Sequence, residues 1–113
     1  MKKSKIFVDI DETICVTPGC ASTARDYAEA SPIIENIEAV NRMYDEGNEI
    51  TYWTARGSVT GIDWRDLTEK QLESWGAKYH DLILGKPPYD IYIDDKSINT
   101  REWERRGRCK PEL

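Results

Sequence analysis

One stretch near the N-terminus, residues 5–13 (Lys-Ile-Phe-Val-Asp-Ile-Asp-Glu-Thr), constrains the fold more than any other part of the chain. Its apolar residues are β-branched or aromatic and form a short run, which favours a buried strand over residues 5–10. Asp9 and Asp11 interrupt the carboxyl end of this run, and an extended backbone points two such residues to the same face. A carboxylate there needs a charge partner or a metal ion, because desolvating an unpaired charge is costly. We therefore expect a ligand site at the end of this strand; the alternative is an acidic turn that Asp11 caps.

The rest of the chain alternates between predicted strands and helices. Further short apolar runs predict strands over residues 49–54, 81–84 and 90–93. Apolar residues at helical spacing, with their start and stop residues, predict helices from Ser31-Pro32 to Gly47, from Asp63 to Gly76, and from Asn99 to Gly107. This alternation predicts an α/β fold, a small Rossmann-like three-layer sandwich with a mainly parallel sheet, in one domain over residues 1–113. Residues 85–89 are too few for a helical crossover, so the strand over 81–84 is expected to be a stub at the sheet edge.

The composition argues against several classes of function. The chain has 16 Lys and Arg against 21 Asp and Glu, a net charge of −5, which is unlike the basic footprint of general nucleic-acid or membrane-surface binders. No apolar run is long enough to span a membrane or to serve as a secretion signal, and the cysteines are odd in number, so we expect a cytoplasmic protein. The set Cys15, Cys20, Cys109 and His80 matches no standard zinc spacing, which leaves a zinc site as a minor alternative.

Polar side chains gather where the predicted strands end. If the strands are parallel, three of these ends share one rim of the sheet. Three or four carboxylates at one rim would repel one another without a cation, and oxygen ligands at that density suit Mg²⁺. A hydroxyl and an ammonium are the groups that would hold phosphate oxygens. The sequence therefore predicts a site for magnesium and phosphate, made by Asp9, Asp11, Thr54, Arg56, Lys86, Asp94 and Asp95.

These residues, in this order, resemble the motifs of the haloacid dehalogenase-like (HAD) phosphatases. The first motif of that family, Asp-x-Asp-x-Thr after an apolar strand, matches residues 9–13. The second, a Thr or Ser that ends the next strand, matches Thr54; the third, a Lys, matches Lys86. The fourth, an acidic pair after a later strand, matches residues 94–95. The contexts of Thr54 and Lys86 are also similar to small stand-alone HAD phosphatases of surface-polysaccharide or sugar metabolism.

The resemblance implies a role for each matched residue. Asp9 would be the nucleophile that attacks phosphorus and forms an aspartyl-phosphate. Asp11 would protonate the leaving alcohol and then deprotonate the attacking water. Thr54 and Lys86 would hold phosphoryl oxygens, with Ala55 and Arg56 as neighbouring substrate-binding residues.

For Arg56, which is not a general family residue, a surface or structural ion pair is an equal alternative to substrate contact. The metal implied by the resemblance is Mg²⁺. Its ligands would be the Asp9 side chain, the Asp11 backbone carbonyl and Asp94, with Asp95 binding directly or through water.

The chain differs from many HAD proteins because it has no room for a cap domain. Only residues 14–30 could form a flap over the site. A closed site matters, since water must be managed around the intermediate. Either a substrate large enough to act as its own lid or a neighbouring subunit would then cover the rim. The resemblance favours a small phosphorylated metabolite, of the sugar or polyol type, in a homo-oligomer.

A receiver-type signalling module, which accepts phosphate on Asp without turnover, is the competing hypothesis. Receivers combine the same residue types, but their acidic pair ends the first strand and their phosphorylated Asp ends the third. Here the order differs. Taken alone, Thr54 is more often a strand-end hydroxyl that satisfies a turn, and Lys86 is more often a solvated loop lysine.

Overall fold

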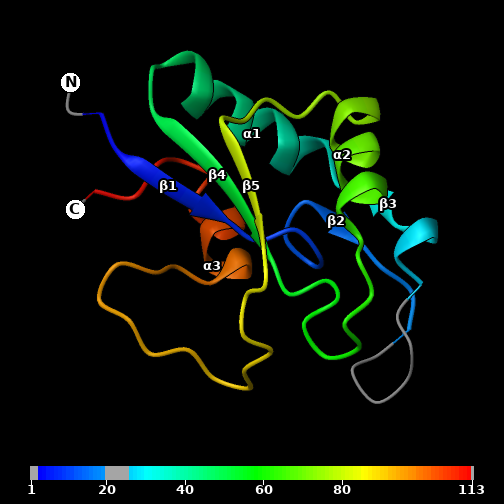
Figure 1. Ribbon diagram of the computed structural model, residues 1–113. Coiled ribbons are helices and arrows are strands. Elements are labelled where there is room, and N and C mark those ends of the chain that lie inside the picture. Colours follow the sequence, from blue (N-terminus) through cyan, green and yellow to red (C-terminus); the bar gives the residue numbers. More distant parts are fainter. Residues whose placement is uncertain (1–2, 20–25, 113) are drawn as a thin grey trace.

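The structure is a computed structural model of the 113-residue chain, and it describes residues 3–19 and 26–112. Figure 1 shows the arrangement of its elements. In chain order they are β1 (Lys5–Val8), β2 (Cys15–Val16), the 3-10 helix η1 (Tyr27–Glu29), β3 (Ser31–Pro32), α1 (Ile34–Asp45), β4 (Glu49–Thr54), α2 (Arg65–Ser74), β5 (Asp81–Leu84) and α3 (Thr100–Arg105).

The main sheet is parallel and has the strand order β1-β4-β5. Its register places Val8 opposite Tyr52, and Tyr52 opposite Leu82. The predicted α/β class, with a Rossmann-like parallel sheet flanked by helices and no cap domain, is therefore confirmed. The strand over 81–84 lies at the sheet edge as predicted, because β5 pairs with β4 alone among the described strands.

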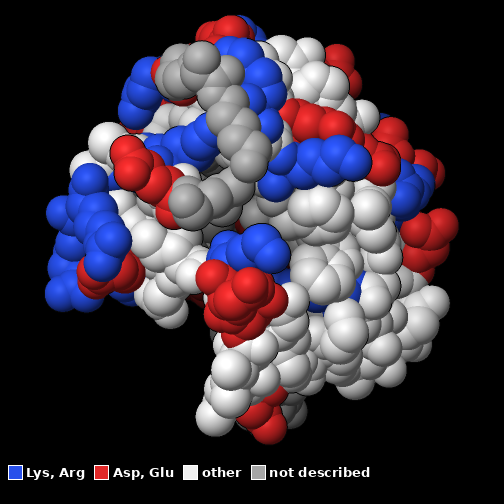
Figure 2. All heavy atoms as spheres, turned by 90° about the vertical axis from the view of Figure 1, so that its left-hand side faces the viewer, with Lys and Arg blue, Asp and Glu red and all other residues white. Residues whose placement is uncertain are grey.

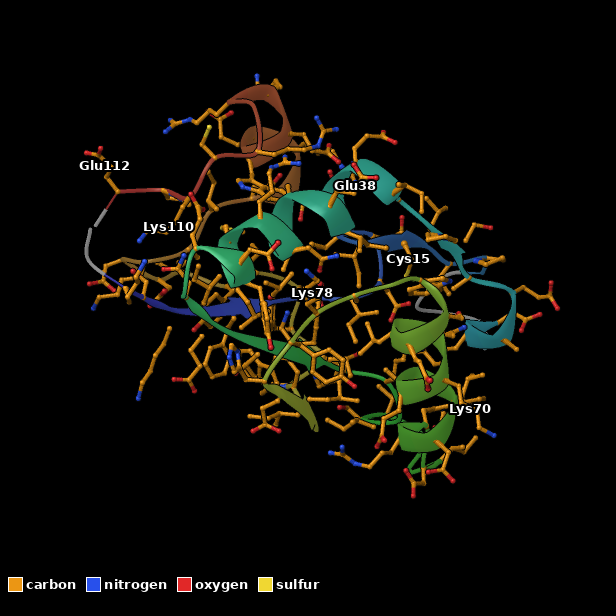
Figure 3. All side chains as sticks on the ribbon, turned by 90° about the horizontal axis from the view of Figure 1, so that it is seen from above. Cys15, Glu38, Lys70, Lys78, Lys110 and Glu112 are labelled. Carbon is orange, nitrogen blue, oxygen red and sulfur yellow. The ribbon has the colours of Figure 1, made fainter. Side chains whose placement is uncertain are left out.

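The core lies on one face of this sheet. Side chains alternate along each strand, so that Val8, Tyr52 and Leu82 point to the same face and are 8%, 0% and 3% exposed. Helices α1 and α2 pack their apolar residues there, while Glu38 and Lys70 project from their outer sides (Figure 3). Burial of these apolar side chains is the main stabilising contribution to the fold. The opposite face is covered less, since Phe7 keeps 55% of its area exposed and packs edge-on against Trp53.

A second, two-stranded antiparallel sheet forms the base of the predicted flap. It pairs β2 with β3, with Val16 opposite Ser31. This pairing, together with the hydrogen bond from the Ile33 N–H to the Ile14 carbonyl (2.8 Å), keeps Ser31 extended. The predicted N-cap at Ser31 is therefore wrong: α1 begins at Ile34, after the cap residue Ile33. Residues 20–25 of the flap lie outside the described residues.

The other predicted helices occur with small shifts. Helix α2 begins at Arg65 with Trp64 as its N-cap, while the predicted cap Asp63 accepts a hydrogen bond from the Arg65 N–H at 3.0 Å. Helix α3 begins as predicted, because the Asn99 side chain accepts from the Arg101 N–H. No helix in residues 3–19 and 26–112 has the length and apolar character needed to cross a membrane.

The predicted strand over residues 90–93 is not present. Those residues belong to a long loop between β5 and α3, drawn in yellow and orange in Figure 1, and Ile91 and Ile93 are 79% and 94% exposed. Two prolines follow Gly85 and Lys86, and the connection is too short to carry the chain across the sheet to the edge of β1 that faces away from β4. Figure 2 shows that the lower part of this side of the molecule, at the height of that loop, is mostly free of charged side chains.

Candidate active site

The carboxyl ends of β1, β4 and β5 meet at one rim, as parallel strands require (Figure 1). Asp9 follows β1, Thr54 ends β4, and Lys86 comes two residues after β5. The Lys86 N–H donates to the Thr54 carbonyl at 3.0 Å, which extends the contact between the two strands by one step. The rim therefore brings together residues that lie 77 positions apart in the sequence, from Asp9 to Lys86.

Lys86 points at Asp9. Its Nζ lies 3.5 Å from Asp9 Oδ1, and the side chain is only 11% exposed, against 39% for Asp9. The ammonium also lies over the rings of Trp53 and Tyr89, at 5.4 and 5.2 Å from their centroids, which favours a cation there. The short loop thus places a buried cation beside the predicted nucleophile, in contrast to the solvated loop lysine considered as an alternative.

Burial raises the pKa of the Asp9 carboxyl above its ordinary value of 3.8. The positive charge of Lys86 and a hydrogen bond from the Ile10 backbone work in the opposite direction, and the nearby charge of Asp11 adds to the increase. Because the folded-state pKa is raised, the contribution of Asp9 to stability decreases as the pH rises through that pKa. The charged form of Asp9 is therefore disfavoured by burial and favoured by the neighbouring Lys86 ammonium.

Asp11 lies in a sharp turn just beyond Asp9. The N–H groups of Thr13 and Ile14 both donate to the Ile10 carbonyl, and Glu12 has the left-handed φ of 65°. The turn directs the Asp11 side chain toward β2, where Thr17 donates a hydrogen bond to its Oδ1. Asp11 is 16% exposed and is thus more enclosed than Asp9.

Arg56 is buried beneath the rim, with 2% of the residue exposed. Its guanidinium forms a two-point ion pair with Asp11, through Nη2 to Oδ1 at 2.9 Å and Nε to Oδ2 at 3.1 Å. Of the two roles considered for Arg56, the ion pair is the one that this structure contains. The next residue, Gly57, has a φ of +82°, and a Cβ there would lie 2.2 Å from the Ile62 carbonyl oxygen, so only glycine allows this close approach within the loop after Arg56.

Thr54 is fully buried, and its Oγ1 accepts a hydrogen bond from the Arg56 N–H at 3.1 Å. In this arrangement the hydroxyl satisfies the turn, and its proton remains available to an acceptor. Ala55 begins the loop after β4, and its carbonyl accepts from the Ser58 N–H. Ser58, which the sequence analysis did not select, donates to the Lys86 carbonyl at 2.8 Å and ties the two rim loops together.

The acidic pair Asp94 and Asp95 does not join this group. Asp94 accepts from the Lys96 N–H at 3.1 Å, and Asp95, with a side chain 79% exposed, lies 3.5 Å from the Lys96 ammonium. Within residues 3–19 and 26–112, no group of three or more His, Cys, Asp or Glu side chains could hold a metal ion. The prediction that three or four carboxylates gather at one rim is therefore wrong for the described residues, because the strand that would carry Asp94 and Asp95 to the rim has not formed.

The minor zinc alternative is not supported either. Cys15 is buried, Cys109 is exposed, and Cys20 lies outside the described residues. His80 is engaged elsewhere, since its Nδ1 accepts from the Ile50 N–H at 3.0 Å. The C-terminal tail with Lys110 and Glu112 lies at the opposite end of the sheet from Cys15 (Figure 3), and Lys110 donates to Ser4 and Asn48 there.

Comparisons with known proteins support the fold alone. No family model matches the chain, and no curated protein matches it. A crystal structure of a target protein from Vibrio cholerae is similar, with a TM-score of 0.73 and 26% sequence identity over 90% of this chain and 87% of that chain. The description of that structure names no activity. The similarity therefore concerns the architecture alone, which the two chains share over most of their length.

Proposed function

We propose that this chain is a phosphatase that hydrolyses a phosphomonoester through an aspartyl-phosphate on Asp9, as the resemblance to HAD phosphatases implies. The observation that carries the proposal is the contact between the buried Lys86 ammonium and the Asp9 carboxylate at the rim of a parallel sheet, 3.5 Å apart. A carboxylate nucleophile and a fixed cation are the two groups that phosphoryl transfer to the protein needs at the reacting centre.

The reaction would proceed in two displacements. In the first, an Asp9 oxygen forms a bond to phosphorus while the bond to the leaving alcohol oxygen breaks, and Asp11 gives that oxygen a proton. In the second, water attacks the same phosphorus, Asp11 takes a proton from the water, and Asp9 leaves as a free carboxylate. Lys86 would offset the negative charge between Asp9 and the phosphoryl group, and Thr54 would donate its hydroxyl to a phosphoryl oxygen.

The proposed enzyme is Mg²⁺-dependent, and the fit of the metal to the structure is incomplete. Asp9 supplies an open carboxylate, and Mg²⁺ commonly uses one or two carboxylates together with waters and a substrate phosphate. Asp94 and Asp95 lie in the exposed loop instead of at the rim. We therefore assign no step to the metal, and the requirement for Mg²⁺ is a prediction that chelation tests directly.

The substrate that we propose is a small phosphorylated metabolite of the sugar or polyol type, in carbohydrate metabolism. Asp9 stays 39% exposed and no cap domain covers it, so the rim can admit a small ester from solvent. A neighbouring subunit of a homo-oligomer would then exclude water during the reaction. Free thiols at Cys15 and Cys109 agree with a reducing cytoplasm.

The test is release of inorganic phosphate with Mg²⁺ across sugar phosphates, polyol phosphates, nucleotides and phosphoproteins. We expect selective turnover of one small class, loss of that turnover in EDTA, and its return on addition of Mg²⁺. Release from none of these esters, with a stable acyl phosphate forming from a small phosphodonor, would contradict the proposal and favour the receiver-type module. Light scattering on the same sample reports the oligomer, and a fully active monomer would contradict the subunit lid.

A further inference from the structure

The Arg56 guanidinium has polar contacts beyond its ion pair with Asp11. Its side chain is fully buried, so each polar contact replaces water that the guanidinium has lost. Besides the two contacts to Asp11, Nη1 donates to Thr68 Oγ1 at 3.1 Å and to Gln71 Oε1 at 2.6 Å, both on α2. Nη2 also lies 4.0 Å from the Cys15 sulfur. The guanidinium is thus held in one orientation by a helix and by the end of β2.

The flap side of the site adds a further contact. The Tyr27 ring lies over the guanidinium, 4.8 Å from its Cζ, and the Tyr27 carbonyl accepts from Gln71 Nε2 at 2.6 Å. Tyr27 also packs edge-on against Trp64, with ring centroids 5.2 Å apart. Residues from η1, α2 and β2 therefore fix the plane of the Arg56 guanidinium where it meets Asp11.

That fixed plane determines where the Asp11 carboxylate can point. A planar guanidinium that donates to both carboxylate oxygens sets the rotation of the carboxylate as well as its position, whereas a lysine ammonium would act as a point charge and set neither. Among the described residues, the Thr17 hydroxyl and the Cys15 thiol also donate to Asp11, and both contact Oδ1 alone. Arg56 is therefore the group that controls the orientation of Asp11.

We propose that Arg56 is a positioning residue that orients Asp11 for proton transfer to the leaving alcohol. The proposal rests on the phosphatase function proposed above, in which Asp11 is the acid. Proton transfer requires its donor within hydrogen-bond reach of the acceptor oxygen, so a protonated Asp11 carboxyl group that rotates freely loses efficiency even though it still carries the proton that it must give. Arg56 itself stays beneath the rim and acts through Asp11.

The experiment compares two esters that differ in their need for a proton. An alkyl phosphate, which is the one that the wild type hydrolyses fastest, has a poor leaving group that requires protonation. The second ester, p-nitrophenyl phosphate, releases a stable phenolate without it. The quantity compared is kcat/KM, because this ratio ends at the first irreversible step and so reports the transfer to Asp9 and not the later hydrolysis.

Arg56→Lys keeps the charge and removes the two-point contact. We expect its kcat/KM for the alkyl ester to fall roughly 100-fold or more, the size of a general-acid contribution, and that for p-nitrophenyl phosphate to fall less than about tenfold. The matched control is Arg65→Lys, on the exposed side of α2, where Arg65 contacts Glu69 and the Leu82 carbonyl. Both esters should be hydrolysed by that control as by the wild type.

Each outcome decides the proposal. Equal losses on the two esters in a folded Arg56→Lys protein would overturn the positioning role while leaving the phosphatase function in place. A wild type that hydrolyses neither ester would overturn both. If thermal unfolding shows that Arg56→Lys does not fold, Thr68→Val decides instead: it removes one support of the guanidinium, and a smaller loss confined to the alkyl ester is expected. Wild-type ratios in folded Thr68→Val would then count against the proposal.

Discussion

Removing one partner of the ion pair between Asp11 and Arg56 should be far more costly on one side than on the other. The side chain of Arg56 is 0% exposed and that of Asp11 is 16% exposed. In Asp11→Ala a guanidinium remains that is buried and has lost its counter-charge. In Arg56→Met the carboxylate that remains can turn toward water and keeps its hydrogen bond from Thr17. The two variants remove the same contact and leave different groups behind.

The magnitudes follow from what is left behind. An uncompensated buried charge costs roughly 3–5 kcal/mol of unfolding free energy, so that loss is expected for Asp11→Ala. Arg56→Met leaves a partly exposed carboxylate in place of a fully buried charge, and it leaves Thr68 and Gln71 without their donor, which costs roughly 1–3 kcal/mol. Against a total of about 5–15 kcal/mol for a domain, a difference near 2 kcal/mol between the variants is measurable.

Urea unfolding followed by far-UV circular dichroism measures both changes, provided that the dependence on denaturant concentration stays constant. Arg65→Met serves as the control, since it removes an exposed arginine from α2, the helix that contacts the Arg56 guanidinium. We expect the order of stability to be wild type, then Arg56→Met, then Asp11→Ala. If the unfolding free energy of Arg56→Met is equal to or lower than that of Asp11→Ala, the reasoning is refuted, because the buried Arg56 would then not be the residue that most needs its counter-charge.

Three further predictions test other parts of the molecule. The Tyr52 hydroxyl is buried without a hydrogen-bond partner among the described residues, so Tyr52→Phe should raise the unfolding free energy by about 1 kcal/mol; an equal loss in urea unfolding would contradict this. Burial raises the pKa of the Cys15 thiol from 9.0 to about 11, so Cys15 stabilises the fold fully below pH 9 and loses that contribution as the pH rises through 11. In a protein with Cys20→Ser and Cys109→Ser, a thiol reagent at pH 8 should label Cys15 only after unfolding, and rapid labelling of the native protein would be inconsistent with that burial. Ile93→Lys should change stability by less than about 0.5 kcal/mol because Ile93 is 94% exposed, whereas a larger loss would mean that residues 90–93 form the buried strand which the sequence predicts.

Much of the rim could be predicted because most of its residues directly follow short apolar runs in the sequence. Asp9 and Thr54 each follow an apolar run directly, and parallel strands put such ends side by side whatever the helices between them do. Lys86 was harder to place from sequence, since a loop residue two positions beyond a strand can point anywhere. Its direction comes from the hydrogen bond between its N–H and the Thr54 carbonyl, and from two aromatic rings.

The acidic pair at residues 94–95 shows where local pattern fails. Residues 90–93 have the β-branched and aromatic composition of a strand, but a strand also needs a partner edge within reach. The short link after Lys86 holds the segment in solvent, and the pair stays with it. The composition of residues 90–93 predicts a strand, but the short connection before them keeps that strand from forming.

The residues that hold the Arg56 guanidinium, Thr68 and Gln71, could not be identified from the spacing of residues in the sequence. Thr68 and Gln71 lie three residues apart, next to Leu72, on the buried side of α2. Polar residues on a predicted apolar helix face were the available signal that this face meets a buried charge. The identity of that charge, Arg56, depends on how α2 packs over the end of β4, which only the tertiary structure provides.

The central claim is that Asp9 is the nucleophile of a phosphatase, and one measurement addresses it directly. Phosphate release from the best ester in the panel is measured with Mg²⁺ for the wild type, for Asp9→Asn, and for Asp45→Asn as a matched control at a surface ion pair with Lys78. We expect the wild type and the control to turn over alike, and Asp9→Asn to remain folded and release no phosphate above the uncatalysed rate. Turnover by Asp9→Asn at the wild-type rate would contradict the account.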